Sequence, residues 1–328
     1  MIPKGKRWAL WDLPWLPPRR FLKNQKMMRL SLSLPGKAAF SHKQLQYLAL
    51  AIGILSLGFG AIFVRWANAP GPVSSFYRMA IALVVLVYPF FRRAIRRGLN
   101  WRGVCIAFIG GVFFGLDMSL WSTGVTLSGA TIPTLLANTA PAWVGLGALI
   151  LFHERLKWAF WIGLALALMG AVTVLGIDQL DITKFDLGGL FGAGAGVFYA
   201  GYFLITQKGR DLLDALSYLW ISVVGSTSVL LLVILVRGQP LVGYSVQSYL
   251  SFLAFGLVTQ VIGWLAINYA QGHLPATIVS PMLLGQPVMT AILAALLLGE
   301  TLTLWQFSGG VMVLVGVYLA HRSRNGIQ

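Results

Sequence analysis

Two ionisable residues lie inside otherwise apolar stretches of the sequence, where a charge is costly. Arg78 follows Pro72 by six residues in one apolar run, and Asp117 precedes Gly124 by seven residues in the next run. A charged side chain in such a run marks, by default, either a function or a paired charge. The two residues could bind the charged groups of a small molecule, or a proton. The structural alternative is a pair that only holds two helices together.

A second group of candidates combines aromatic and amide side chains, which can stack on a solute and hydrogen-bond to it. The group consists of Trp121, Tyr199, Gln260, Trp264 and Asn268. Trp and Tyr also anchor helices at membrane interfaces. This alternative applies to Trp121, and Asn268 likewise lies near the end of its run. Gln260 and Trp264 lie nearer the middle of theirs, which favours contact with a cavity.

The sequence contains one long stretch twice, at residues 130–170 and 276–316. A constant offset of 146 residues relates the two copies without a gap. A period of this length is too long for a solenoid and indicates two homologous halves. Each copy has a central proline, a glutamate, and glycines seven residues apart. The matched residues are Pro141 and Pro287, Glu154 and Glu300, Gly163 and Gly309, and Gly170 and Gly316.

The two prolines predict bends within membrane-crossing helices. Each removes a backbone hydrogen bond, which leaves the carbonyls of Ala137 and Leu283 free. A free carbonyl is tolerated where it faces protein or a watery cavity. Asn138 shares a helix face with Pro141 by its spacing, so we expect this face to border a cavity. Packing against a neighbouring helix is the alternative.

Two further patterns predict a helix end and a helix contact. Glu154 and Glu300 fall in the turns that precede the fifth and tenth apolar runs. An acid at a helix N-terminus stabilises the helix by about 0.3–1 kcal/mol, so capping is the expected role and coupling of transport the alternative.

Gly188, Gly192 and Gly196 recur at every fourth position, which predicts a helix face that another helix approaches closely.

The composition places the chain in a membrane. Hydrophobic residues make up 57% of the 328 residues and charged residues only 10%, whereas soluble domains carry about 25% charged residues. Ten apolar runs have the length of about 17–25 residues that spans ~30 Å of hydrocarbon. They are residues 47–67, 72–91, 103–124, 129–151, 158–177, 187–206, 215–236, 248–270, 274–298 and 304–320. The predicted fold is an all-α integral membrane protein with ten transmembrane helices.

Charge and motif content exclude several functional classes. The basic residues that give the net charge of +16 lie between the apolar runs rather than on one soluble face, so we expect no nucleic-acid partner. Cys105 is the single cysteine, which excludes an intrachain disulfide and a cysteine-based metal site. No metalloprotease, esterase or P-loop motif occurs. We therefore expect a protein that is not an enzyme and that needs no metal and no cofactor.

The basic residues predict the orientation, because positively charged loops face the cytoplasm. With the N-terminus inside, all 25 Lys and Arg residues except Arg65, Arg78, Lys184 and Arg237 fall on the cytoplasmic side. Five spans per half is an odd number, so the second half enters from the opposite face and the repeat is inverted. The predicted parts are a basic cytoplasmic tail, disordered or on an anionic membrane surface (1–46), a first five-helix repeat (47–177), an outer linker (178–186), a second five-helix repeat (187–321) and a cytoplasmic C-terminus (322–328).

The paired proline and glutamate stretches resemble those of the drug/metabolite transporter superfamily, specifically its ten-helix EamA-type permeases. Phe76-Tyr77-Arg78 at the start of the second span and the glycine- and aromatic-rich stretch 192–203 add to the resemblance, which covers about residues 47–321. The resemblance implies ten helices around a central cavity. It also implies the transport of small organic solutes, often outward.

The resemblance and the residues together predict a membrane carrier that exports a small metabolite, such as an amino acid, by alternating access. A proton-coupled exporter of cationic drugs is the alternative, which needs an unpaired Asp117. Arg78 and Asp117 both lie about 9–11 Å below the outer helix ends, so we expect them to pair. A channel or a membrane enzyme is less favoured.

The expected location is the plasma (inner) membrane of a bacterium, with both termini cytoplasmic. The expected partners are a small-molecule substrate and the lipid bilayer, with anionic lipid at the N-terminal tail. The expected state is a monomer or a homodimer.

Overall fold

The computed structural model describes residues 41–128, 131–176 and 187–325, and all regular structure in these ranges is helical. The helices are α1 His42–Gly58, α2 Gly60–Ala67, α3 Gly71–Arg97, α4 Trp101–Ser128, α5 Thr131–Ala137, α6 Ala140–Leu151, α7 Trp158–Gly176, α8 Leu187–Arg210, α9 Ala215–Val236, α10 Val246–Ala254, the π-helix η4 Phe255–Trp264, α11 Leu265–Gln271, α12 Ala276–Met282, α13 Gly285–Leu298 and α14 Leu304–Asn325. In the described ranges they form ten stretches that are long and apolar enough to cross a membrane. The predicted all-α fold with ten transmembrane spans is confirmed.

Only some of the predicted boundaries between the parts of the chain can be compared with the structure. Residues 1–40 of the predicted tail and the predicted linker 178–186 lie outside the described residues. The first helix begins at His42, five residues before the predicted start of the first half. The last helix continues to Asn325, past the predicted end of the second half at residue 321.

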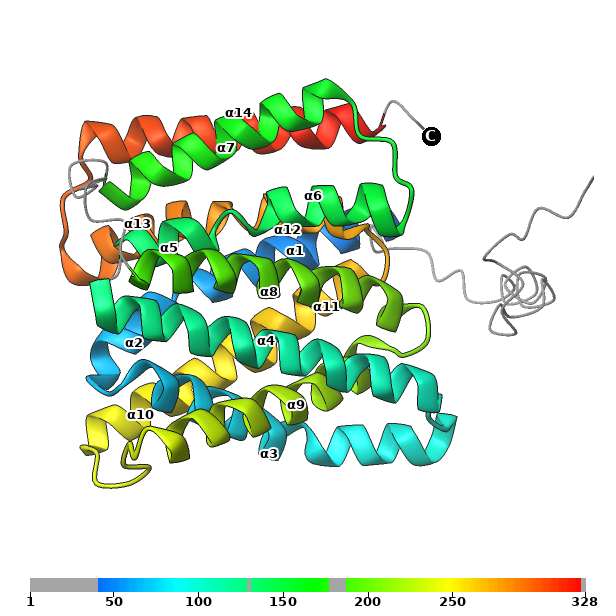
Figure 1. Ribbon diagram of the computed structural model, residues 1–328, viewed down its shortest axis with the longest axis vertical. Coiled ribbons are helices and arrows are strands. Elements are labelled where there is room, and N and C mark those ends of the chain that lie inside the picture. The colour runs from blue at the N-terminus through cyan, green and yellow to red at the C-terminus, as the bar shows by residue number, and fades with distance from the viewer. Residues whose placement is uncertain (1–40, 129–130, 177–186, 326–328) are drawn as a thin grey trace, which may run out of the picture. The chain divides into compact units, whose positions relative to one another are not determined.

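The helices pack across the two halves rather than within them. In the first half, α3 packs on α9 and η4, α4 packs on α8 and α9, and α7 packs on α14. Figure 1 shows α7 and α14 running side by side. The contact of the third span with the sixth is matched by contacts of the first span, α1, with the eighth, η4 and α11. A two-fold related repeat requires this exchange, so the packing agrees with the predicted inversion, which itself stays a prediction.

Glycines make the closest of these crossings possible. A Cβ atom on Gly170 would lie 2.6 Å from the Gly309 carbonyl oxygen, and one on Gly163 would lie 2.7 Å from the Gly316 carbonyl oxygen. The repeated glycines of the two halves therefore pack on each other where α7 crosses α14. On α8, a Cβ atom on Gly192 would lie 2.7 Å from the Pro133 carbonyl oxygen of α5. The predicted close approach to the glycine face of α8 is confirmed.

Gly111 provides a test of how strongly the stability of the protein depends on glycine at such a close helix crossing. It lies on α4 against α9, and a Cβ atom added there would overlap the backbone carbonyl oxygen of Ser222. We expect Gly111→Ala to destabilise the folded protein by about 1–3 kcal/mol, because overpacking forces a backbone to shift. Gly194→Ala is the matched control, since its nearest neighbour would be Leu120 Cδ1 at 3.5 Å. Equal melting temperatures of the two detergent-solubilised variants would contradict this expectation.

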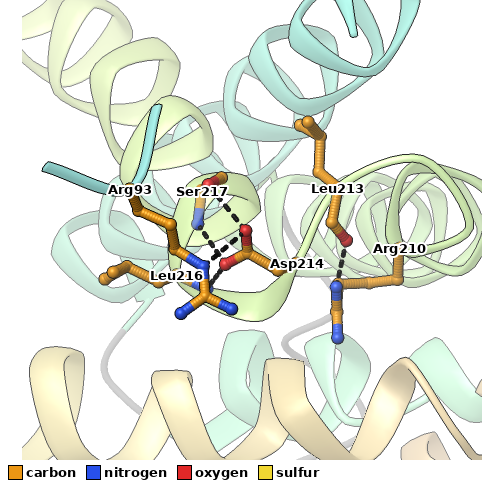
Figure 2. Close-up of polar contacts among 6 residues, drawn as sticks. All are labelled: Arg93, Arg210, Leu213, Asp214, Leu216 and Ser217. Carbon is orange, nitrogen blue, oxygen red and sulfur yellow. Dashed lines mark hydrogen bonds and ion pairs between the residues drawn. The ribbon is translucent and has the colours of Figure 1, made fainter. Parts of the chain in front are cut away.

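A polar cluster joins α3 to the turn between α8 and α9 (Figure 2). Asp214 caps α9 by accepting hydrogen bonds from the backbone N–H groups of Leu216 at 3.1 Å and Ser217 at 3.2 Å. The same carboxylate forms an ion pair with Arg93 Nε at 2.8 Å. In the same turn, Arg210 donates from Nη1 to the Leu213 carbonyl oxygen. This turn is therefore ordered by charge as well as by helix capping.

The pH dependence of stability follows from the state of Asp214. Burial alone would raise the pKa of its carboxyl group, but hydrogen bonds from Ser217 and Arg93 and the charge of Arg93 outweigh burial and lower the pKa. The stabilisation is therefore present above the unfolded-state pKa of about 3.9 and is lost as the pH falls below it. We expect Asp214→Asn, which keeps a capping side chain, to reduce the loss of melting temperature between pH 5 and pH 3, a range set by that reference value. An unchanged acid-induced loss would show that other carboxyl groups govern it.

Candidate functional site

The eighth span changes from an α-helix to a π-helix at its centre. The ten residues of η4, Phe255–Trp264, follow α10 and precede α11 without a break. π-Helical turns are rare and occur frequently at functional sites. Within η4, Gln260 is 1% exposed and Trp264 is 2% exposed. The widened helix therefore carries the two residues of this span that the sequence favours most as cavity residues, and both are buried in the bundle.

Arg78 is held by Gln260 and by two aromatic rings. Its Nε donates a hydrogen bond to Gln260 Oε1 at 2.8 Å. The guanidinium carbon lies 5.0 Å from the ring centroid of Phe255 and 5.6 Å from that of Phe114. Such cation–π contacts contribute about 2 kcal/mol when desolvated. Arg78 Nη2 is buried without a hydrogen-bond partner among the described residues, so one face of the guanidinium can still donate.

The predicted contact between Arg78 and Asp117 is wrong. Among the described residues, ion pairs within 4.0 Å join Arg65 to Glu300 and Arg93 to Asp214, and neither includes Asp117. The reason is the packing across the halves. Helix α3 packs mainly on α9 and η4, and α4 mainly on α8 and α9, so these consecutive helices are not each other's principal neighbours.

Asp117 is nevertheless buried in the same region. Its side chain is 2% exposed, and Oδ2 has no hydrogen-bond partner among the described residues. Its charge acts on Arg78 and on Tyr199 across the space that separates them. An arginine and an aspartate side chain are thus buried near each other without an ion pair between them. This arrangement is costly unless each charge is matched by another group.

Aromatic rings surround this charged region. Phe114 stacks on Tyr202 with centroids 4.7 Å apart and meets Trp264 edge to face, also at 4.7 Å. Tyr199 lies 6.1 Å from Phe114 and 6.2 Å from Trp264. We call these four residues, together with Phe203, the aromatic cage; its members are Phe114, Tyr199, Tyr202, Phe203 and Trp264. An aromatic lining suits an organic solute and can stack on a cation.

Asn268 extends the cage toward one end of the bundle. Its Nδ2 donates to the Trp264 carbonyl oxygen at 2.9 Å and to the Tyr202 hydroxyl oxygen at 3.3 Å. Asn268 Oδ1 and Trp264 Nε1 are buried without hydrogen-bond partners among the described residues. Buried polar atoms are normally paired, so the unpaired donors and acceptors gathered around one cage make it the candidate binding site.

Two matched helix breaks lie beside the cage. The fourth span breaks between α5 and α6, and the ninth span breaks between α12 and α13, at positions related by the repeat. Pro141 and Pro287 lie in the first turns of the helices that follow these breaks, which agrees with the predicted bends. The Leu283 carbonyl oxygen, predicted to be free, instead accepts a hydrogen bond from the Gln286 N–H at 2.9 Å. The break is thus closed by a tighter turn rather than left open.

A small cavity of about 20 Å³ lies between the two breaks. It is lined by Asn138, Ala140, Pro141, Tyr199, Phe203, Ser280, Leu283, Leu284 and Gln286. A cavity of this size holds about one water molecule. The expected cavity-facing position of Asn138 and Pro141 agrees with this lining. Because Tyr199 borders both the cavity and the cage, the two form one continuous region in the middle of the bundle.

Trp121 lies apart from this region. Its indole Nε1 donates to Thr134 Oγ1 at 2.9 Å, which joins α4 to α5. Trp121 makes no ring contact with the cage among the described residues. Its structural role is therefore the connection between two consecutive spans.

The two repeated glutamates end helices rather than begin them. The N–H of Glu154 donates to the Ala148 carbonyl oxygen at 3.1 Å, and that of Glu300 to the Ala294 carbonyl oxygen at 3.5 Å. Each bond reaches back six positions and follows a residue with positive φ, His153 or Gly299, so it closes the C-terminal end of α6 or α13. The predicted capping of the following helices is wrong, because α7 and α14 have no acidic residue in their first turns.

Both glutamate side chains reach the opposite half of the chain. Glu154 Oε2 accepts a hydrogen bond from Thr277 Oγ1 of α12 at 2.9 Å. Glu300 Oε1 forms an ion pair with Arg65 Nη1 of α2 at 2.7 Å. One contact lies where the fourth span ends and the other where the ninth span ends. Since five crossings separate these positions, the two contacts lie at opposite faces of the membrane.

A model of the EamA-like transporter family matches the chain twice, at residues 44–176 and 186–322. The chain belongs to this family. Each match covers one of the two homologous halves, so the repeat that the sequence predicts corresponds to two copies of one family unit. Members of this family are transporters and not enzymes. The predicted membrane transporter is therefore confirmed, whereas its substrate and its direction of transport belong to the next section.

Relatives of this EamA-like transporter carry general names. An uncharacterized transporter of Bacillus subtilis is 23% identical over 67% of this chain and 71% of its own length. An uncharacterized transporter of Archaeoglobus fulgidus is 23% identical over 84% of this chain and 95% of its own. A probable amino-acid metabolite efflux pump of Salmonella typhimurium is 27% identical over 54% of this chain and 62% of its own.

A solved structure confirms the fold of the EamA-like transporter. It is titled only as the crystal structure of a protein, and it superposes with a TM-score of 0.69 at 17% identity. The match covers 84% of this chain and 96% of the other. At this identity the likeness supports the arrangement of the helices and nothing about the substrate.

Sequence reasoning named Tyr199 and Trp264 of the cage but missed the two rings that contact Arg78. Phe114 and Phe255, which flank Arg78, were not among the candidates. One signal could have found Phe114, because it precedes Gln260 by the repeat offset of 146. Two of the three residues that hold Arg78, Phe114 and Gln260, thus occupy equivalent positions of the two halves. The π-helix has no comparable signal in its sequence.

Proposed function

We propose that this EamA-like transporter exports a small zwitterionic metabolite of the amino-acid type. One observation carries the proposal: a buried guanidinium and a buried carboxylate face the same aromatic region without pairing. Arg78 keeps a free Nη2 donor and Asp117 a free Oδ2 acceptor among the described residues. A solute with one carboxylate and one ammonium group has the complementary pair of charges.

The energetics favour a zwitterion over a singly charged solute. The carboxylate would accept charge-assisted hydrogen bonds from Arg78, and the ammonium would pair with Asp117. Each charge of the solute then matches one charge of the protein, so no net charge is added to a poorly solvated site. The relative named a probable amino-acid metabolite efflux pump supports this substrate class.

A proton-coupled exporter of organic cations is the second candidate. The specific observation in its favour is the unpaired Oδ2 of Asp117, because a cation or a proton can bind there without displacing Arg78. Arg78 argues against a simple cation site. Its positive charge already interacts with Asp117 and would repel a second cation bound there.

The same arrangement supports alternating access. The contact of Glu154 with Thr277 and that of Glu300 with Arg65 each join the two halves, at opposite faces. Both are present together around a cavity of only about 20 Å³. We propose that opening toward one face breaks one contact and leaves the other intact. The helix breaks at Pro141 and Pro287 would let the fourth and ninth spans bend during this movement.

A cysteine reporter tests these contacts. In a Cys105→Ser background, Gln286→Cys places a thiol at the cavity between the helix breaks. We expect Thr277→Val to raise its labelling from the face of Glu154, and Arg65→Gln to raise it from the opposite face. The increase for Arg65→Gln should be no more than about fivefold, because an exposed ion pair contributes about 1 kcal/mol or less. Increases from the same face would refute the assignment to separate faces.

The proposed orientation has both termini in the cytoplasm of a bacterial cell, with the transporter in the plasma membrane. The basic residues support it, because the end of α3, the start of α4, the α6–α7 connection and the ends of α8 and α14 all carry them at one face. Labelling of an Arg155→Cys variant from outside intact cells would overturn the orientation.

Counterflow in proteoliposomes tests the substrate. Purified protein would be loaded with an excess of unlabelled solute, and the entry of labelled amino acids, nucleosides or organic cations would be followed. We expect saturable, transient accumulation of a neutral amino acid, which a channel cannot produce. Arg322→Gln, which alters an exposed arginine far along the chain from the cage, should behave like the unchanged protein. Counterflow of organic cations alone would replace this proposal with the second candidate.

A further inference from the structure

An apolar groove lies on the bundle surface between α3, α4 and α9, away from the aromatic cage. Its volume is about 500 Å³, within the range of about 300–1,000 Å³ that is usual for small-molecule sites. Its lining residues are Phe90, Leu99, Trp101, Val104, Cys105, Phe108, Ile109, Trp220, Ile221 and Val224. The indole N–H of Trp220 donates to the Leu83 carbonyl oxygen at 3.1 Å, so this ring offers the groove only its apolar surface.

The groove extends from the membrane surface into the hydrocarbon. It lies at the face where α3 ends and where α4 and α9 begin. Ile109 follows the first residue of α4 by eight positions, which is about 12 Å along the helix axis. The lining is open to the surroundings, since Trp101 is 75% exposed and Ile109 is 49% exposed. A long apolar chain can therefore lie in the groove with its polar end at the membrane surface.

Arginine side chains border the mouth of the groove. Arg97 follows the lining residue Phe90 by seven positions on α3, and Arg102 precedes Cys105 by three and Ile109 by seven on α4. These spacings place both arginines on the helix faces that line the groove. Both are exposed and make no hydrogen bond or ion pair with the described residues. Arg93, in contrast, is engaged by Asp214.

We propose that this groove binds one acyl chain of an anionic phospholipid, whose phosphate is bound by Arg97 and Arg102. The apolar lining matches the chain, and the two unpaired guanidinium groups match the negative headgroup. A second copy of this chain fits the groove less well. A two-fold contact would place the same arginines of both copies against each other, and like charges would repel.

Native mass spectrometry tests the lipid site without reference to transport. The protein would be purified after exchange into a mixture of equal parts phosphatidylglycerol and phosphatidylcholine. We expect one phosphatidylglycerol to be retained per chain, at least tenfold over phosphatidylcholine. The variant with Arg97→Gln and Arg102→Gln should lose this preference. Arg155→Gln, an exposed arginine at the same face but on the α6–α7 connection, should keep it.

A second variant separates the groove from the arginines. Val224→Phe narrows the groove and should reduce retention of the anionic lipid at least fivefold. Val236→Phe, at the opposite end of α9 and 78% exposed, is the matched control and should retain it. Equal retention of both lipids by the unchanged protein would overturn the proposal, as would an unaffected preference in the double arginine variant.

The single cysteine tests the competing occupant directly. Cys105 lines the groove and is exposed. If a second copy occupied the groove, a mild oxidant would convert membrane-embedded protein to a dimer through Cys105, and Cys105→Ser would abolish this dimer. We expect no such cross-link in phosphatidylglycerol membranes. A Cys105-dependent dimer that excludes the lipid would assign the groove to protein contact instead.

Discussion

Replacing Arg78 with glutamine is expected to reduce transport at least thirtyfold while leaving a folded protein. Arg78 is held by Gln260 at 2.8 Å and by two aromatic rings, and its Nη2 is free to bind a solute. The charge pair that Arg78→Gln removes is the proposed one between the guanidinium and the carboxylate of the solute. Removing one partner of a buried, hydrogen-bonded charge pair costs about 2–5 kcal/mol, which corresponds to a loss of at least about thirtyfold. The measurement is initial counterflow rate against the amount of folded protein in the vesicles.

Asp117→Asn should reduce transport to a similar extent, because it removes the opposite charge of the proposed site. The double variant distinguishes a binding site from a structural pair. If the two residues only compensated each other's charge, the double variant would recover activity, because no charge would be left unpaired. We expect no recovery, since the two side chains form no direct ion pair.

Arg322→Gln is the matched control for the loss of an arginine. Its side chain is exposed near the end of α14, so its removal should leave transport largely unchanged. Normal transport by both Arg78→Gln and Asp117→Asn would show that these residues are not the site. The search would then move to Asn138, Gln260 and Trp264.

Replacing Pro141 and Pro287 with alanine is expected to reduce transport at least tenfold without destabilising the protein. Alanine supplies an N–H group that can bond to the carbonyl four residues earlier, so each break can close into a continuous helix. A continuous fourth or ninth span would resist the bending that alternating access requires. Because alanine adds a backbone N–H group that can form a hydrogen bond, the melting temperature should stay the same or rise.

Pro89→Ala provides the control for the loss of a helix proline. Pro89 lies inside α3, away from the cavity between the two breaks, so its replacement should leave the transport rate largely unchanged. The comparison is between counterflow rate and protein abundance in the membrane. A parallel fall of both quantities in the Pro141 and Pro287 variants would indicate a folding role for the prolines instead.

The sequence alone determined the class of the protein. The thickness of the hydrocarbon sets the length of a spanning helix, so ten apolar runs were enough to predict ten spans. The constant offset between residues 130–170 and 276–316 revealed two halves. Pro141 and Pro287 predicted the helix breaks, because a missing backbone N–H acts within its own helix. These features are local, because each depends on residues that lie close together in the chain.

Only the tertiary structure decided which side chains meet. Arg78 bonds to Gln260, which lies 182 residues away, rather than pairing with Asp117 on the next span. Glu154 and Glu300 end their own helices and contact the opposite half instead of capping the helices that follow. The π-helix that presents Gln260 has no sequence signature. Partners across the bundle depend on how ten helices pack on one another, and several packings bury the same apolar faces equally well. The contacts that select one packing join residues far apart in the chain, so they exist only once the halves have come together.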